Sequence, residues 1–342
     1  MRGPRPASRK PRPSQTSISV IIAAKDAERT IARAVLSALA QPQVAEVILV
    51  DDGSSDRTAQ EAGAAAAGDS RLHVVRLPTN RGPSAARNEA IRRSTQPLIA
   101  VLDSDDLYLP ARFDRLLARD DWDIVADNII FVTDDQAQDI RPTEYPSPEA
   151  QWFELDLVKF VLGNISRRGA PRGELGFLKP VFRRSFLETH GLGYREEMRL
   201  GEDFELCARM LASGARFLVT RGCGYVAVER EDSLSAQHSV ADLVRMIEAE
   251  RELEASFELS DAGHRALRRH EAHLTRKVRH GRFLDEKKKS GFLAAAGAAG
   301  LHPQSLADVA IAVAGDKIET VRTRWLGGRS AERRPRMLLP FR

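Results

Sequence analysis

An apolar run from Ala100 to Leu102 ends in three acidic residues within four positions, Asp103, Asp105 and Asp106. Asp is a poor strand former and like charges this close repel one another, so such a group at a strand end usually has a cation to hold. Asp103 and Asp105 can direct two carboxylates at one hard ion, and Mg²⁺ or Mn²⁺ prefers oxygen ligands. The alternative is a solvated turn in which Asp106 caps the next helix.

Apolar segments alternate with helical patterns in the N-terminal part of the chain. Strands are predicted at Ile18–Ala24, Glu46–Val50, Arg71–Arg76 and Leu98–Leu102, with helices between them. This alternation predicts an α/β fold with a mostly parallel, Rossmann-like sheet flanked by helices. Ligands bind beyond the carboxyl ends of the strands in such sheets. A second acidic turn, Asp51-Asp52, also follows a predicted strand, so we expect both turns to face one site.

The rest of the chain has a less regular pattern. One or two strands are expected over Asp123–Val132, a helix over Gly201–Ser213, and two late strands at Phe217–Thr220 and Gly224–Val228. From Val240 on, the pattern is helical. We therefore expect three regions: a disordered basic arm (residues 1–16), an α/β domain (residues 17–236) and a helical C-terminal region with a basic tail (residues 237–342).

The composition excludes several classes of protein. The 342 residues are 42% hydrophobic and 29% charged with a net charge of +4, as is typical of a globular protein. Two cysteines, Cys207 and Cys223, are too few for a disulfide framework and favour packing roles in a reducing compartment. No apolar stretch reaches the roughly 18 residues of a membrane span, and no signal peptide is evident. We expect a cytoplasmic protein.

Four motifs follow one another in a specific order and spacing, and a fifth lies further along the chain. They are Ser19–Ala24, Val50–Thr58, Asn80–Asn88, Leu102–Asp106 and Gly201-Glu202-Asp203. Together they resemble family-2 glycosyltransferases with the GT-A fold, and the order and length are most similar to bacterial exopolysaccharide enzymes of the succinoglycan type. The resemblance implies transfer of a sugar from a nucleotide sugar, expected to be a UDP-hexose, to a hydroxyl group with inversion at the anomeric carbon.

The resemblance also assigns residues to the donor. Asp52 matches the residue that hydrogen-bonds the base, and the backbone of Ala23 and Ala24 lies where the base packs. Arg87 is expected near the diphosphate, which a guanidinium suits well. Asp103, which would support the ribose or the metal, and Ser104 are grouped with these donor-binding residues. Two alternatives stay open: Asp52 as a cap of the helix after Ser54-Ser55, and Arg87 as a solvated helix residue.

The metal and the catalytic base are assigned in the same way. Asp105 matches the metal-ligating residue of the family, with Asp103 as a second ligand, and the cofactor is expected to be Mn²⁺ or Mg²⁺. Asp203 matches the general base for the acceptor hydroxyl, with Glu202 beside it. A helix N-terminus at this point favours the ionised carboxylate. The alternative is that Asp203 is an N-cap with no substrate near it.

Two other functions compete with glycosyl transfer. A nucleotidyltransferase would normally need a Gly-rich and basic phosphate loop after the first strand, and Ala24–Ala27 does not supply one. A non-catalytic nucleotide-sugar-binding module would not need both Asp105 and Asp203. The expected partners are a nucleotide-sugar donor and a lipid-linked oligosaccharide acceptor. The basic ends favour contact with an anionic membrane surface at the inner face of the cell membrane, and no nucleic acid is expected.

Overall fold

Four apolar segments form the parallel half of one sheet. They are β1 (Ile18–Ala24), β2 (Val44–Asp51), β3 (Leu72–Arg76) and β4 (Leu98–Val101), in the spatial order β3-β2-β1-β4. β1 and β4 are buried along nearly their whole length, as expected of central parallel strands. The computed structural model describes residues 16–140, 151–166, 173–229, 239–292, 294–295, 297 and 335–339.

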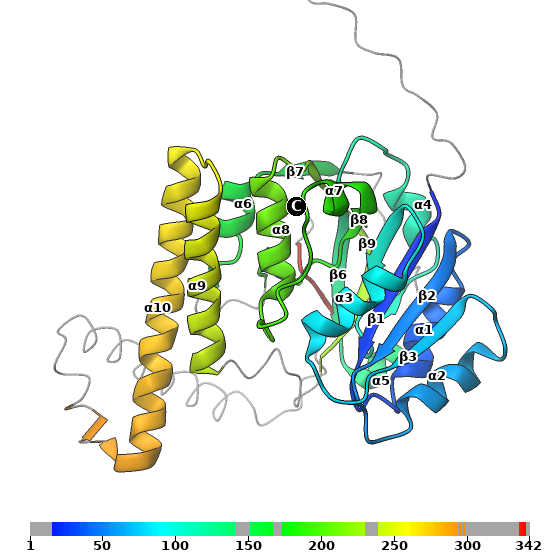
Figure 1. The fold of residues 1–342 in the computed structure, drawn as a ribbon, viewed down its shortest axis with the longest axis horizontal. Coiled ribbons are helices and arrows are strands. Elements are labelled where there is room, and N and C mark those ends of the chain that lie inside the picture. Colours follow the sequence, from blue (N-terminus) through cyan, green and yellow to red (C-terminus); the bar gives the residue numbers. More distant parts are fainter. Residues whose placement is uncertain are drawn as a thin grey trace, which may run out of the picture.

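Three helices connect these strands. They are α1 (Ile31–Leu39), α2 (Thr58–Ala66) and α3 (Pro83–Arg93), and α3 begins with a proline, which is favourable at a first helical position. β1, β2 and β4 end on the same side of the sheet, toward the bottom of Figure 1. The bounds of these four strands match the sequence-based prediction to within about two residues, and helices lie between them as predicted.

The second half of the sheet is mixed. The short strand β8 (Val181–Arg183) lies antiparallel between β4 and β6 (Ile124–Val132), and β6 pairs in parallel with β9 (Phe217–Val228). β9 is one continuous strand, so the prediction of two separate late strands was wrong. Its register against β6 shifts around Asn128, which lies opposite Cys223.

Short elements complete the sheet and its edges. The remaining strands are β5 (Leu107–Tyr108) and β7 (Trp152–Leu155), both paired with β9, and β10 (Arg336–Met337), which pairs with β6. The remaining helices of the α/β part are α4 (Arg112–Leu116), α5 (Asp134–Gln138), α6 (Leu157–Leu162), α7 (Arg184–Thr189), α8 (Glu202–Ala212) and a 3₁₀ turn, η3 (Leu175–Phe177).

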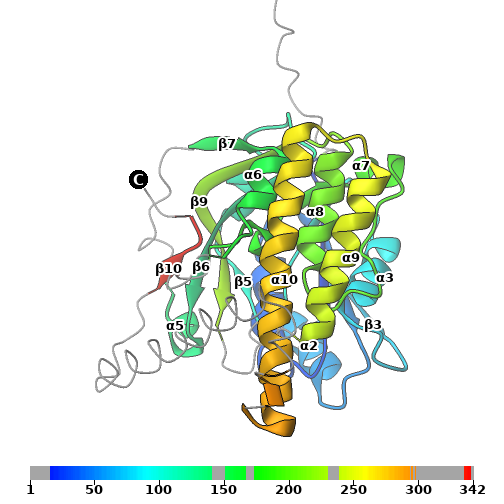
Figure 2. The same ribbon diagram turned by 90° about the vertical axis from the view of Figure 1, so that its left-hand side faces the viewer.

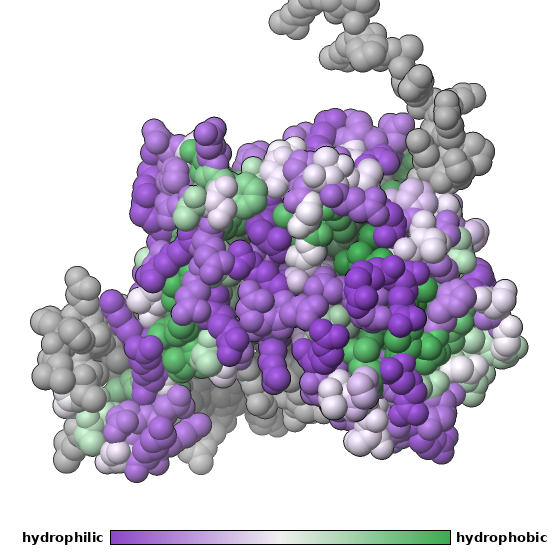
Figure 3. Space-filling model, in the orientation of Figure 1, coloured by the Kyte–Doolittle hydropathy of each residue, from purple (hydrophilic) through white to green (hydrophobic). Residues whose placement is uncertain are grey.

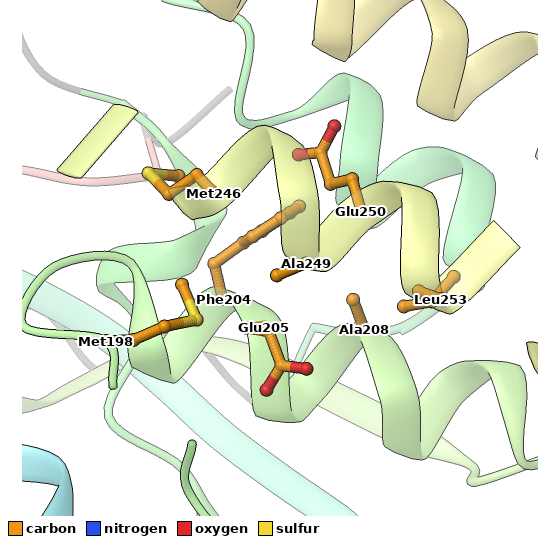
Figure 4. Close-up of a pocket in the computed structure, with 8 residues that line it drawn as sticks. All are labelled: Met198, Phe204, Glu205, Ala208, Met246, Ala249, Glu250 and Leu253. Carbon is orange, nitrogen blue, oxygen red and sulfur yellow. The ribbon is translucent and has the colours of Figure 1, made fainter. Parts of the chain in front are cut away.

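A hairpin of two long helices covers one side of this α/β part. α9 (Val240–Ser256) and α10 (Asp261–Ser290) each begin with a serine whose hydroxyl caps the first turn, Ser239 and Ser260. Figure 2 shows the hairpin lying against α6 and α8. In Figure 4, Phe204 of α8 faces the side of α9 that carries Ala249.

The helical hairpin shares its core with the sheet. Leu253, Ala266 and Leu267 belong to the same buried cluster as the residues of β1 and β4. A buried pair, Glu250 and His270, joins the two helices. The boundary expected near residue 236 therefore separates chain segments whose apolar side chains are packed together.

Several expectations concern the surface and the chain ends. In the described part of the chain no helix is long and apolar enough to cross a membrane. Figure 3 shows hydrophilic side chains over much of the face that it draws, with hydrophobic patches among them. Both cysteines are buried and unpaired, which fits the packing role expected of them. Residues 1–15 of the basic arm and most of the C-terminal tail lie outside the described residues.

Candidate active site

The turn after β4 delivers Asp103 to a buried charged site. The backbone amide of Leu102 still bonds to β1, through the carbonyl of Ile21, and the next amide, that of Asp103, donates to the hydroxyl of Tyr225 at 3.1 Å. The two carboxylate oxygens of Asp103 then accept from different cations. Arg87 Nη2 lies 2.7 Å from Oδ1, and the ammonium of Lys179 lies 2.8 Å from Oδ2.

The first turn of α8 brings two further carboxylates to the same place. Glu202 Oε1 accepts from Arg87 Nη1 at 2.6 Å. Asp203 Oδ2 accepts from the ammonium of Lys179 at 2.7 Å, and its Oδ1 accepts from the Tyr194 hydroxyl at 3.1 Å. Arg87 Nη1 also lies 3.9 Å from Asp203 Oδ1. Segments 100 positions apart in the sequence therefore meet through two cations.

A glycine fixes the entry to this turn. Gly201 precedes α8 with φ of +75°, a conformation that residues with a Cβ rarely adopt. A Cβ at this position would also lie 2.8 Å from the terminal methyl of Met246 on α9. The Gly-Glu-Asp order thus matches what the backbone requires, with the conformationally free residue first and the two acids on the helix N-terminus, where negative charge is favoured.

We call this group the site cluster. Its members are Arg87, Asp103, Lys179, Tyr194, Glu202 and Asp203. It holds three carboxylates and two cations, and the exposed fraction of the side chain rises from 7% for Arg87 to 28% for Asp103. The cluster is thus mostly enclosed but open to solvent at the carboxylate of Asp103.

The charges of the cluster stabilise one another. Burial opposes the charge of Lys179, but the carboxylates of Asp103 and Asp203 outweigh it and raise the lysine's pKa. Burial likewise opposes the charge of Asp103, and the nearby cations still lower the pKa of that carboxyl well below its usual range. The pKa of the Arg87 guanidinium is raised for the same reason, against the effect of burial. All three groups are therefore charged at neutral pH.

The position of Arg87 decides one open alternative. The guanidinium is buried among carboxylates and lies over the ring of Tyr194, with 5.4 Å between its central carbon and the ring centre. It is therefore not the solvated helix arginine that the sequence also allowed. Its assignment to the donor diphosphate stays a prediction.

Asp105 and Ser104 lie beside the cluster and are half-buried. The backbone carbonyl of Asp105 accepts from Arg33 at 3.2 Å, which fixes the turn against α1. Among the described residues no three His, Cys, Asp or Glu side chains group to hold a metal ion by themselves. Mg²⁺ in nucleotide sites is usually held by one or two carboxylates together with substrate phosphates. The assignment of Asp105 and Asp103 to such an ion stays a prediction.

Asp106 has a structural position instead of a capping one. Its carboxylate accepts from the Tyr225 hydroxyl at 2.7 Å and from the Val228 amide at 2.9 Å. Burial first, and then the neighbouring charges of Asp105 and Asp103, raise its pKa well above the usual value. The alternative in which Asp106 caps the next helix is wrong, because its carboxylate binds the hydroxyl of Tyr225 and the amide of Val228 in β9.

Asp52 is also engaged by backbone. Its two carboxylate oxygens accept from the amides of Arg81 and Gly82, at 2.7 and 2.8 Å, and so close the segment before α3 onto β2. Its own amide donates to the carbonyl of Ala24 at 2.8 Å. The alternative role as a cap of α2 is wrong, because Asp56 accepts from the first amide of that helix.

The donor-base contacts expected of the first strand remain predictions. Ala24 is buried at the end of β1, and Ala23 before it is half-buried. The next residue, Lys25, turns toward the second motif, and its ammonium donates to the carbonyl of Gly53 at 2.9 Å. The first two motifs are thus connected directly at the carboxyl ends of β1 and β2.

Sequence reasoning missed Lys179 and Tyr194. Lys179 is the one charged residue in the segment Phe177–Phe182, which is otherwise apolar and leads into β8. A single charge in a segment that enters a buried strand was the available signal, since such a charge needs a partner. Tyr194 gave no comparable signal. It is held by Asn88 of α3, whose side-chain amide bonds both its backbone amide and its carbonyl.

Comparison with known proteins gives the family. The model of glycosyl transferase family 2 matches residues 19–188. The chain is 50% identical over 310 residues to the succinoglycan biosynthesis protein ExoU of Rhizobium meliloti, an alignment that covers 90% of each chain. The chain belongs to glycosyltransferase family 2. A second relative, ExoO of the same organism, is 38% identical over 237 residues, 68% of this chain and 66% of ExoO.

Solved structures give the fold of this family-2 glycosyltransferase as GT-A. S. aureus TarS 1–349 in complex with UDP-GlcNAc superimposes with a TM-score of 0.56 at 19% identity, over 86% of this chain and 78% of that one. The mannosyltransferase PcManGT from Pyrobaculum calidifontis, in complex with GDP-Man and Mn²⁺, gives a TM-score of 0.51 at 19% identity, over 94% and 91%. The expected fold and enzyme class are confirmed, and the nucleotidyltransferase and non-catalytic alternatives are set aside.

Proposed function

We propose that this enzyme transfers a hexose from a UDP-sugar to a hydroxyl of a lipid-linked or oligosaccharide acceptor in exopolysaccharide biosynthesis, with inversion and with a divalent cation. The relatives ExoU and ExoO are succinoglycan biosynthesis proteins, which supports the pathway class. The structural neighbour TarS is in complex with UDP-GlcNAc, which supports a UDP-sugar as donor.

The observation that carries the proposal is the meeting of two acidic motifs in the site cluster. Asp103, which follows β4, and Asp203, on the first turn of α8, accept from the same ammonium. In this proposal the first motif binds the donor and the second binds the acceptor. An enzyme that joins two substrates needs these functions side by side, because orientation of the reacting groups lowers the barrier substantially.

Asp203 is the proposed general base. Its carboxylate takes the proton of the acceptor hydroxyl as the hydroxyl oxygen attacks the anomeric carbon. The bond from that carbon to the diphosphate oxygen breaks, and its electron pair leaves with the nucleoside diphosphate. One direct displacement inverts the anomeric carbon, so an α-linked donor gives a β-linked product. A carboxylate oxygen has two lone pairs, so Asp203 can accept this proton beside its existing hydrogen bonds.

Arg87 and the divalent cation have complementary proposed tasks. Asp105, with Asp103, would hold Mn²⁺ or Mg²⁺, which supplies positive charge for the leaving diphosphate when it is bound. The neighbour PcManGT is in complex with Mn²⁺ and GDP-Man, which supports this cofactor class. Arg87 lies 2.7 Å from Asp103 and can offer its remaining donors to a phosphate oxygen.

The proposed lipid-linked acceptor implies contact between the enzyme and a membrane. A lipid-linked acceptor places the enzyme at the inner face of the cell membrane, where basic segments are attracted to anionic lipid. The basic tail proposed to make this contact lies outside the described residues. Asp52, Ala23, Ala24 and Ser104 are proposed to contact the nucleoside.

A donor screen tests the function. Purified enzyme is heated with each member of a panel of UDP-, GDP- and dTDP-sugars, with and without Mn²⁺, and the melting temperature is recorded. A bound donor stabilises the folded state by mass action, so we expect a UDP-hexose with Mn²⁺ to give the largest rise. UDP release from that sugar is then measured. A panel in which no nucleotide sugar raises the melting temperature or is turned over contradicts the proposal.

A further inference from the structure

Lys179 occupies the centre of the site cluster. Its side chain is 11% exposed, and its ammonium lies 2.8 Å from Asp103 Oδ2 and 2.7 Å from Asp203 Oδ2. These carboxylates come from opposite sides of the cluster, one from the turn after β4 and one from α8. The ammonium has three donors, of which these carboxylates take two.

Arg87 does not replace this bridge. Its guanidinium joins Asp103 to Glu202 at 2.7 and 2.6 Å, but it stays 3.9 Å from Asp203. Lys179 is therefore the cation in direct contact with both Asp103 and Asp203. Without it, two carboxylates would face each other across a mostly buried space, where their repulsion is weakly screened. Among the described residues, Asp203 would then keep only the Tyr194 hydroxyl as a close side-chain hydrogen-bond donor.

The backbone of Lys179 is held firmly. Its carbonyl accepts from Arg112 Nη2 at 2.6 Å, and Arg112 is itself fixed by Asp127 at 2.9 Å. β8 begins two residues later, and Val181 pairs with Ala100 of β4. The strand that delivers Asp103 thus also supports the lysine. Side chains on such rigid elements can hold a reacting group to within a fraction of an ångström.

We propose that Lys179 is a positioning residue of the transfer reaction, whose ammonium holds the carboxylate of Asp203 where it takes the acceptor's proton. This inference rests on the proposed function. Two of the three donors of Lys179 contact carboxylates, so we expect its loss to lower kcat by more than it weakens donor binding. A misplacement of about 1 Å at a reacting group costs on the order of 10²-fold in rate.

The test compares Lys179→Met and Lys179→Arg with the intact enzyme. The rate of UDP release from the UDP-hexose found in the donor screen is measured with Mn²⁺ and with water as acceptor, which also loses a proton to the base. Calorimetry gives Kd for UDP with Mn²⁺. For Lys179→Met we expect kcat to fall on the order of 10²-fold, with donor KM and UDP Kd within about twofold. Lys179→Arg keeps the charge and should recover part of kcat.

A matched substitution controls for the loss of an ion pair. Lys159 pairs with Asp156 on the surface, where its side chain is 63% exposed, so Lys159→Met should leave kcat unchanged. If Lys179→Met does not fold, Lys179→Gln and Lys179→Arg are measured for the same split between kcat and UDP Kd.

Two results overturn the inference. One is an unchanged kcat in the folded variants. The other is a tenfold weaker UDP affinity with kcat intact, which would make Lys179 a donor ligand. Failure of the proposed function is distinguishable, because the intact enzyme would then neither bind UDP nor release it from any UDP-hexose.

Discussion

Two buried clusters of charge lie side by side in this enzyme and differ in their access to solvent. In the Arg112 cluster, Arg112 and Asp127 pair at 2.9 Å with side chains 0% and 1% exposed. The guanidinium packs against the rings of Tyr108, Phe113 and Tyr225. In the site cluster the pairs are equally short, but the Asp103 side chain is 28% exposed. No substrate can reach the first cluster, whereas the second opens to solvent.

The difference shows that two clusters of buried charge can differ in whether a substrate could reach them. A buried ion pair contributes little net stability, because desolvation offsets the attraction, but breaking it is costly in either cluster. The two clusters differ in the number of carboxylates for each cation. Within the described residues Arg112 pairs with one carboxylate, whereas Arg87 and Lys179 pair with three, so the site cluster holds one carboxylate more than it has cations. The clusters meet at Lys179, whose carbonyl accepts from Arg112.

The largest effect is expected from Asp203→Asn. The amide cannot take a proton, so UDP release should fall on the order of 10²–10⁴-fold. Rates are measured at saturating UDP-hexose and Mn²⁺, and the unfolding midpoint is measured in parallel. The control is Asp121→Asn, which removes a carboxylate outside the site cluster. The side chain of Asp121 is 40% exposed, so this variant should leave the rate unchanged. A rate within a few-fold of the intact enzyme would place the base elsewhere, with Glu202→Gln as the next variant.

Arg112→Met should affect the folded state strongly. It leaves Asp127 buried without its cation, which typically costs about 3–5 kcal/mol of unfolding free energy. Urea unfolding measures the change. The exposed pair of Arg57 and Glu61 is the control, and Arg57→Met should cost no more than about 0.5 kcal/mol. An equally small loss of unfolding free energy for Arg112→Met would contradict the description of Arg112 and Asp127 as a buried pair whose rupture is costly.

Asp105→Asn should lower the affinity for the metal ion and leave the stability of the fold unchanged. Removal of one carboxylate from the expected cation site should raise the Mn²⁺ concentration needed for half-maximal UDP release by tenfold or more. The rate is followed against Mn²⁺ in metal-stripped enzyme, with melting temperature as the control for folding. Full activity of the intact enzyme in EDTA would show that the reaction does not depend on a divalent cation.

Gly224→Ala should give a smaller loss of stability, again in the Arg112 cluster. A Cβ at Gly224 would lie 2.2 Å from Asp127 Oδ2 and 2.6 Å from Arg112 Cγ. Overpacking of this kind costs about 1–3 kcal/mol. Gly63→Ala is the control, because its new methyl group meets nothing within 4 Å. Alanine in place of glycine within a helix should raise the free energy of unfolding by about 0.5–1 kcal/mol. An unfolding curve of Gly224→Ala that shifts to higher stability, as expected for Gly63→Ala, would show that the cluster tolerates expansion.

Much of the fold could be predicted from sequence because it depends on local pattern. The continuous apolar runs gave β1 and β4, and the acidic turn after β4 contributes Asp103 to the site cluster. The continuity of β9 was missed, since its glycines are typical of turns and only pairing with β6 shows otherwise.

The sequence identified acidic residues of the site cluster but not the residues that join them. Asp103 and Asp203 were identified, but the ammonium that joins them comes from a segment with no motif. Asp52 and Asp106 were assigned roles by their place in the sequence, while their partners are backbone amides and a tyrosine hydroxyl brought there by the fold. Such pairings depend on tertiary packing, which periodicity does not encode.

A crystal structure of the enzyme grown with UDP and Mn²⁺, with data collected for manganese anomalous scattering, tests the central claim most directly. The account predicts a manganese peak within coordination distance of Asp105, with the UDP diphosphate on that ion and near Arg87. It also predicts that Asp203 faces the diphosphate across a space open to the acceptor. Manganese and UDP bound away from the site cluster would contradict the account.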